Sequence, residues 1–196
     1  MGAAVGAMRT RVRFDNDATY QLTEQAATAF AGYSTPTGWS FRAAIGALLD
    51  GALEREDMPG AHDIAPGMVG ALGLSRHWTL GDGDWFITGS AGLSVAAATT
   101  HEPAATDDPL FLAGDLRIGA IAGRTLGEIW NPYILARAFG GPVSWSIDGT
   151  DTVGSDTRHF QLGAGVSVVT SFGLTIVVDV SALGEQGASL GASWRL

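Results

Sequence analysis

Phe160-Gln-Leu-Gly-Ala-Gly-Val-Ser-Val-Val is followed almost at once by Phe172-Gly-Leu-Thr-Ile-Val-Val-Asp-Val-Ser and then by Ala188-Ser-Leu-Gly-Ala-Ser-Trp-Arg-Leu. In each segment every second residue is apolar and the residues between are small or polar, a period of two that is typical of a β-strand. The apolar faces are Phe160, Leu162, Ala164, Val166 and Val168; Phe172, Leu174, Ile176, Val178 and Val180; Leu190, Ala192, Trp194 and Leu196. Because the chain closes on such a strand, with an aromatic residue on its apolar face, we interpret this face as meeting lipid rather than a second sheet.

The composition of the chain fits a single all-β domain that spans residues 1–196. Charged residues make up 16% of the sequence, below the usual quarter, and the 28 glycines are about twice the average share. This bias disfavours a disordered chain and a helical bundle. No stretch approaches the roughly 18 apolar residues of a membrane helix. A mean hydropathy of +0.18 suits a membrane barrel whose strands turn one face to a polar lumen.

The charged residues and the absence of cysteine exclude several classes of function. The formal net charge is −9, so we do not expect nucleic acid as a partner. The chain has no cysteine, which excludes disulfides and thiol chemistry. All 11 basic residues are arginine, which we attribute to the codon bias of a GC-rich genome. The phosphate-binding glycine loop, the Gly-x-Ser-x-Gly elbow and the His-Glu-x-x-His motif are absent, so we expect neither a cofactor nor catalysis.

Residues 1–10 do not read as a secretory signal, because they lack a charged start and a long apolar stretch. An exported barrel needs such a signal. We therefore expect the numbering to start at a mature or engineered terminus; the alternative is a protein that is not exported.

Ten strand candidates follow one another along the chain, separated by turn-forming residues. They cover residues 3–14, 18–33, 37–53, 67–80, 85–99, 110–124, 129–146, 157–170, 172–183 and 187–196. Three breaks are long and acidic, at 54–66, 100–109 and 147–156, and these are the third, fifth and seventh breaks. Odd and even connections of an up-and-down barrel emerge on opposite sides, so this parity predicts long loops at one end and tight turns at the other. We expect an antiparallel transmembrane barrel of about ten strands, with eight or twelve as alternatives.

Aromatic residues gather near the predicted strand ends, where they would form two girdles around an aliphatic band. One girdle, on the side of the tight turns, comprises Trp39, Trp78, Trp85, Trp130, Tyr133, Phe172 and Trp194. The other, on the side of the long loops, comprises Phe14, Tyr20, Phe111, Trp145 and Phe160. A soluble barrel or sandwich would concentrate its aromatics mid-strand, where only Phe139 clearly lies. The pattern favours a membrane barrel over a soluble all-β protein.

Over nearly its whole length the chain resembles small bacterial outer-membrane β-barrel proteins, in pattern rather than in residue motif. The most specific element is the last strand, with Leu190, Ala192, Trp194 and Leu196 on one face, which is similar to the C-terminal signal that the family's assembly machinery reads. The resemblance implies membrane lipid as the surroundings, a Gram-negative outer membrane as the location, and insertion by that machinery. It implies no particular activity; an envelope protein partner is a further candidate.

Charged residues on the polar strand faces predict a charge network inside the barrel. Arg9, Arg11 and Arg13 alternate on one face, and each would cost about 2–4 kcal/mol on a lipid face near the midplane, so we expect them to point inward. The same network would contain Arg42, Arg117, Arg137, Arg195, Glu24, Asp50, Asp115 and Asp179. Arginine suits such a network because its guanidinium pairs with carboxylates in a bidentate manner. We interpret the network as a structural plug, with a selective lining for anions as the functional alternative.

Two segments depart from regular alternation. The two faces of residues 18–33 do not separate cleanly, which predicts a bulge or a crossing through the lumen. The segment 129–146 contains Pro132 and a Gly140-Gly141-Pro142 break, at which we expect a kink.

Histidines and carboxylates near the predicted long loops offer candidate chemistry. Histidine with carboxylates binds metals or activates water, and His62, His101 and His159 are the metal candidates here. The acidic residues near them are Asp63, Glu102, Asp107, Asp108, Asp148, Asp151 and Asp156. The oxygen-rich segment 148–156 would suit calcium but lacks the EF-hand spacing. We expect a solvated acidic rim and an ordinary surface loop rather than a site.

The sequence therefore predicts a non-enzymatic, porin-like barrel of the cell envelope that serves as a structural or surface-binding component or as a narrow pore. One alternative is a rim-active hydrolase, since the omptin family of outer-membrane proteases uses aspartate and histidine at the rim of a ten-stranded barrel. The catalytic pairs of that family do not match this sequence residue by residue. The other alternative is a soluble lipocalin-like barrel that binds a small apolar ligand.

Overall fold

The computed structural model describes residues 1–57, 60–81, 84–101, 108–147 and 150–195, and this part of the chain folds into antiparallel strands. The strands are β1 (Gly2–Phe14), β2 (Thr19–Ser34), β3 (Trp39–Arg55), β4 (Ala61–Ile64), β5 (Gly67–Leu80), β6 (Trp85–His101), β7 (Leu110–Arg124), β8 (Trp130–Gly140), β9 (Pro142–Ile147), β10 (Thr150–Asp156), β11 (Phe160–Val169), β12 (Leu174–Gly184) and β13 (Gln186–Trp194). Among the described residues no helix is long and apolar enough to cross a membrane.

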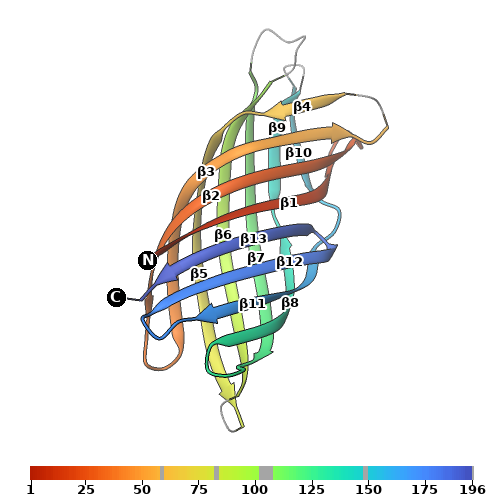
Figure 1. Ribbon diagram of the computed structural model, residues 1–196. Coiled ribbons are helices and arrows are strands. Elements are labelled where there is room, and N and C mark those ends of the chain that lie inside the picture. Colours follow the sequence, from red (N-terminus) through yellow and green to blue (C-terminus); the bar gives the residue numbers. More distant parts are fainter. Residues whose placement is uncertain (58–59, 82–83, 102–107, 148–149, 196) are drawn as a thin grey trace.

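The strands close into a barrel, which confirms the predicted fold class (Figure 1). The hydrogen-bonded ring runs β1–β2–β3–β5–β6–β7–β8–β11–β12–β13, and β13 pairs back with β1. The described residues form thirteen strands rather than ten because the predicted strand 129–146 is divided into β8 and β9, and because β4 and β10 form within the predicted loops 54–66 and 147–156. β4 and β5 follow one path, as do β8 and β9, and β10 and β11. The ring itself therefore has ten strands.

Successive connections alternate between the two ends of the barrel. We call the end that joins β1 to β2, β3 to β4, β6 to β7 and β9 to β10 the loop end, and the opposite end the turn end. Both chain termini lie at the turn end, where the amino group of Met1 donates to the carbonyl oxygen of Trp194 at 3.0 Å. The prediction that odd-numbered and even-numbered connections lie at opposite ends of the barrel is confirmed. The predicted loops 54–66 and 147–156 are shorter than expected, since they contain β4 and β10.

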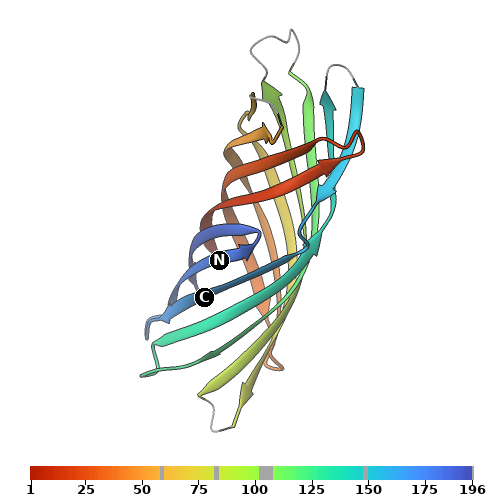
Figure 2. The same ribbon diagram turned by 90° about the vertical axis from the view of Figure 1, so that its right-hand side faces the viewer.

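The barrel narrows toward its loop end. There β10 pairs with β1 and with β9, and β9 pairs with β7, so the ring runs through β1, β2, β3, β4, β6, β7, β9 and β10. The β12–β13 hairpin ends below this ring, with Gln186 opposite Arg9 in the middle of β1 (Figures 1 and 2). Its turn requires Gly184, which has a φ of 80° and lies so close to the Phe160 carbonyl oxygen that a Cβ would collide with it. The barrel thus has a ring of ten strands toward the turn end and a ring of eight strands at the loop end.

Both predicted irregularities are present. The pairing of β2 with β3 shifts register between Gln25 and Ala26, which is the bulge expected in residues 18–33. The expected kink separates β8 from β9 at Gly141, where a Cβ would collide with the Gly114 carbonyl oxygen of β7. Pro142, which lacks an N–H group, then begins β9.

The outward face of the barrel is apolar over its middle. Leu72, Leu93 and Leu116 are register partners on β5, β6 and β7, and each side chain is more than half exposed. The outward residues of β11, β12 and β13 are those predicted, except that Leu196 lies outside the described residues. An apolar band of this extent exceeds the patches that soluble proteins expose, and it fits a lipid-facing surface.

Replacing Leu93 by arginine tests whether this band faces lipid. We expect Leu93→Arg to reduce the free energy of unfolding of the barrel in lipid vesicles by about 2–4 kcal/mol, because the charge would enter the middle of the bilayer. Thr99→Arg, on the outward face of the same strand near the loop end, should cost about 0–1 kcal/mol. Urea titrations of both variants measure the difference, and equal costs would contradict a lipid-facing band.

Candidate functional site

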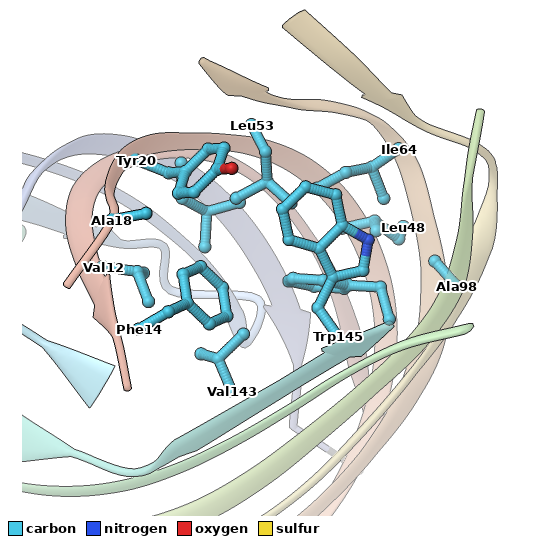
Figure 3. Close-up of a cluster of buried hydrophobic side chains, with 12 residues drawn as sticks. Val12, Phe14, Ala18, Tyr20, Leu48, Leu53, Ile64, Ala98, Val143 and Trp145 are labelled. Atoms are coloured by element: carbon cyan, nitrogen blue, oxygen red, sulfur yellow. The ribbon is translucent and has the colours of Figure 1, made fainter. Parts of the chain in front are cut away.

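The lumen at the loop end is filled by apolar side chains, which we call the apolar cap (Figure 3). Its aromatic residues contact one another: the ring of Tyr20 lies 5.5 Å from that of Phe14 and 5.3 Å from that of Trp145. Trp145 is 1% exposed, and its indole N–H donates to Thr100 Oγ1 at 2.8 Å, so the ring is both packed and hydrogen-bonded. The buried members are Val12, Phe14, Ala18, Tyr20, Leu22, Leu48, Leu53, Ile64, Ala98, Phe111, Val143 and Trp145.

The apolar cap overturns the predicted girdle on the side of the long loops. Phe14, Tyr20, Phe111 and Trp145 are at most 2% exposed and point into the lumen, so their placement at a lipid boundary was wrong. The physical reason is the eight-strand ring, which is narrow enough for side chains to fill. Phe160 does point outward and is half exposed.

The aromatics on the side of the tight turns mostly face outward. Trp78, Trp85, Trp130, Phe172 and Trp194 are 41–60% exposed near the turn end. Trp39 is partly exposed and lies under the guanidinium of Arg76, 5.2 Å from its ring centroid. Tyr133 was wrongly assigned to this girdle: it is buried inside the barrel, and its hydroxyl donates to Asp179 Oδ1 at 2.6 Å.

A buried charge network crosses the lumen where the β12–β13 hairpin ends. Its centre is Glu185, which is 2% exposed and receives two hydrogen bonds from Arg117, at 2.9 and 3.1 Å. Arg117 also donates to Asp115 at 3.0 Å, and the side-chain amide of Gln161 donates to Glu185 at 3.0 Å. The network therefore ties the hairpin turn to β7 and β11. No feature of the sequence distinguishes Glu185 from an ordinary turn residue, and the prediction missed it.

A second group of charges continues the network toward the turn end. Arg137 donates to Gln161 Oε1 at 3.0 Å and lies 4.0 Å from Asp179. Asp179 also accepts from Ser189 at 3.2 Å as well as from Tyr133. The predicted inward positions of Asp115, Arg117, Arg137 and Asp179 are those observed.

Four predicted members of the network lie on the outside instead. Arg9, Arg11 and Arg13 are exposed, whereas their neighbours Thr10 and Val12 are buried. Arg11 pairs with Glu56 at 2.7 Å and Arg13 with Asp17 at 3.2 Å, both at the loop end. The prediction was wrong because β1 extends past the apolar band, so a charge on its outer face there need not enter lipid. Asp50 is also exposed, as the partner of the outward Gln25.

Two cavities occupy the lumen below the apolar cap. The inner chamber has a volume of about 310 Å³ and is lined by residues that include Glu24, Val12 and Leu22. The vestibule, about 1080 Å³, is lined by turn-end residues such as Thr35 and Trp194, and by the predicted lumenal Arg42 and Arg195. Arg117 and Arg137 line both cavities and thus mark their boundary. The guanidinium of Arg42 lies over the Phe30 ring, 4.4 Å from its centroid.

The three candidate metal histidines do not form a cluster. His62 packs against Trp145 at the apolar cap, with ring centroids 4.7 Å apart. His101 is exposed and its Nδ1 lies 3.0 Å from Asp108 Oδ1, while His159 is exposed at the start of β11. No group of three His, Cys, Asp or Glu side chains able to hold a metal occurs within the described ranges. Of the neighbouring acids, Glu102, Asp107 and Asp148 lie outside the described residues.

Comparisons with known proteins identify the fold. The chain is similar to the β domain of the Bordetella autotransporter BrkA, with 15% sequence identity, coverage of 100% of this chain and 99% of that chain, and a TM-score of 0.50. A mutant of the Rh. blastica porin is 9% identical over 99% of both chains, but its TM-score of 0.17 is too low to show that the two folds are the same. No family model matches the sequence, and no curated protein is significantly similar to it. The chain has the fold of a bacterial outer-membrane β-barrel.

Removing the charge of Glu185 tests the central ion pair. We expect Glu185→Gln to lower the free energy of unfolding by about 3–5 kcal/mol. The guanidinium of Arg117 would then remain buried without the carboxylate that accepts two of its hydrogen bonds. Glu128→Gln, in the exposed turn between β7 and β8, is the matched control and should change stability by less than about 0.5 kcal/mol. Urea unfolding in vesicles provides the measurement. Equal stabilities of the two variants would show that Arg117 does not depend on Glu185.

Proposed function

We propose that the protein is a closed, non-enzymatic barrel of the bacterial outer membrane that acts as a structural and surface-binding component of the envelope rather than as a pore. The apolar outward band and the fold support membrane insertion. The loop end, which carries the longest connection, that from β6 to β7, would face the exterior, and the turn end with both termini would face the periplasm.

The observation that carries this proposal is the apolar cap. An aqueous pore needs a continuous polar path, and the cap places Phe111, Trp145 and Leu53, all at most 1% exposed, across the lumen. The charge network around Glu185 lines the lumen below it, and its groups bond to one another. The narrow-pore alternative is therefore the weaker of the two predicted roles.

The rim supports a surface-binding role rather than a catalytic one. Exposed acidic residues gather at the loop end, and several pair with arginine there, as Glu56 does with Arg11 and Asp57 with Arg55. The side chain of His62 packs into the apolar cap, whereas those of His101 and His159 are exposed, so the histidines do not converge on one cleft. Because the similarity to the BrkA β domain shows the fold alone, the role of that protein is not carried over.

Conductance in planar bilayers tests the closed state. We expect the wild-type barrel to pass no measurable ion current, and the double variant Phe111→Ala/Trp145→Ala to open a path by removing the two largest buried rings. Trp85→Ala, which removes an outward-facing ring, should stay closed.

Each protein is first shown to be folded by its heat-dependent shift on a gel, so that current is compared among intact barrels. Stable current steps from the wild-type protein would contradict the proposal. A folded double variant that passes no current would show that the apolar cap is not the barrier.

A further inference from the structure

The inner chamber lies between the apolar cap and the vestibule. It shares Val12, Leu22 and Val143 with the apolar cap and shares Arg117 and Arg137 with the vestibule. Its volume of about 310 Å³ falls at the lower limit of pockets that bind small molecules, which span about 300–1,000 Å³. The chamber is therefore large enough for a small ligand and is reached from the turn end.

The walls of the inner chamber combine apolar side chains with a few polar groups. Met8, Leu22, Val69, Leu135 and Phe139 supply apolar surface from four different strands. A concave apolar surface with a small number of converging polar groups is the usual composition of a ligand site. Such walls fit an apolar body better than a hydrated inorganic ion.

The charges that line the inner chamber are unbalanced. Five carboxylates border it, Glu24, Asp115, Asp156, Asp179 and Glu185, against the two arginines that it shares with the vestibule. Arg117 is engaged by Asp115 and Glu185, and Arg137 lies beside Asp179. Within the described residues no ion pair joins Glu24 or Asp156 to an arginine; Asp156 instead accepts from Thr10 at 2.8 Å. The chamber is thus lined by more carboxyl groups than arginines.

Among the described carboxyl groups that line the chamber, Glu24 is the one with neither a hydrogen bond nor an ion pair to another side chain. Its side chain is partly buried on the inward face of β2, and its Oε1 is shielded from solvent with no hydrogen-bond partner among the described residues. A buried carboxylate is costly unless it is paired, so a positively charged group in the chamber would be stabilised by it. The described residues offer no set of three ligands for a metal ion, which favours a single-point contact with an ammonium group.

We propose that the inner chamber binds an organic cation, an ammonium group on a small apolar body, with Glu24 as its counter-ion. The apolar body contacts Leu22, Leu135 and Phe139, and the ammonium group donates to the free oxygen of Glu24. The ligand enters through the vestibule, because the apolar cap closes the loop end. This site goes beyond the proposed envelope role and does not depend on whether the barrel conducts.

Calorimetric titration of the detergent-solubilised barrel with two probes tests the site. Phenethylammonium carries the charge, and 2-phenylethanol is its neutral counterpart of similar size. We expect the ammonium probe to bind at least about tenfold more tightly than the alcohol, the ratio that one charge-assisted hydrogen bond supplies. Glu24→Gln should abolish this preference while leaving the weak binding of the alcohol unchanged.

Two further variants make the result decisive. Glu54→Gln changes an exposed glutamate on the outside of β3 and should retain the full preference. Ala96→Leu narrows the chamber from β6 and should weaken both probes, which supports the location even if Glu24→Gln fails to fold. Equal affinity of the two probes, no binding of either, or an unchanged preference in a folded Glu24→Gln barrel would overturn the proposal.

Discussion

The buried carboxylate of Glu185 lies at the point where the barrel changes from ten strands to eight. It holds the turn of the β12–β13 hairpin to Arg117 on β7 and to Gln161 on β11. Because the hairpin stops there, β10 continues past it and pairs with β1. A buried ion pair by itself is weak support for stability. Here the position of the pair matters more than its contribution to stability. The hairpin turn places the carboxylate of Glu185 inside the lumen, where Arg117 and Gln161 donate hydrogen bonds to it.

The narrowing explains the order of layers inside the barrel. Eight strands leave room that side chains fill, and in this protein aromatic residues fill it, which gives the apolar cap. Ten strands enclose more space, and there the lumen holds the charge network, the inner chamber and the vestibule. The outer surface of the barrel is thus apolar over its middle, and the lumen is apolar at the loop end. Polar groups gather inside where the ring is wide.

The orientation of side chains could be predicted from the sequence where one face of a strand meets lipid, because that face must be apolar. The predictions were wrong for residues that lie beyond the lipid or inside the narrowed ring. The alternation in residues 160–194 fixed the outward faces of β11, β12 and β13 because lipid excludes polar groups from one side only. The same reasoning failed for Arg9, Arg11 and Arg13, which lie on a strand that extends beyond the lipid. It failed for Phe14 and Trp145 because alternation does not reveal that the ring narrows. Glu185 depends on contacts between distant strands, which spacing along the chain does not encode.

The change from ten strands to eight depends on the pairing of β10 with β1, and cysteine cross-linking measures this pairing directly. The chain contains no cysteine, so an introduced pair has no competing thiol. Arg13 and Ser155 are exposed register partners across this seam, and Arg9 and Gln186 are register partners on β1 and β13. We predict that Arg13→Cys/Ser155→Cys cross-links as readily as the control pair Arg9→Cys/Gln186→Cys in the folded barrel. A cross-link in the control pair alone would contradict it.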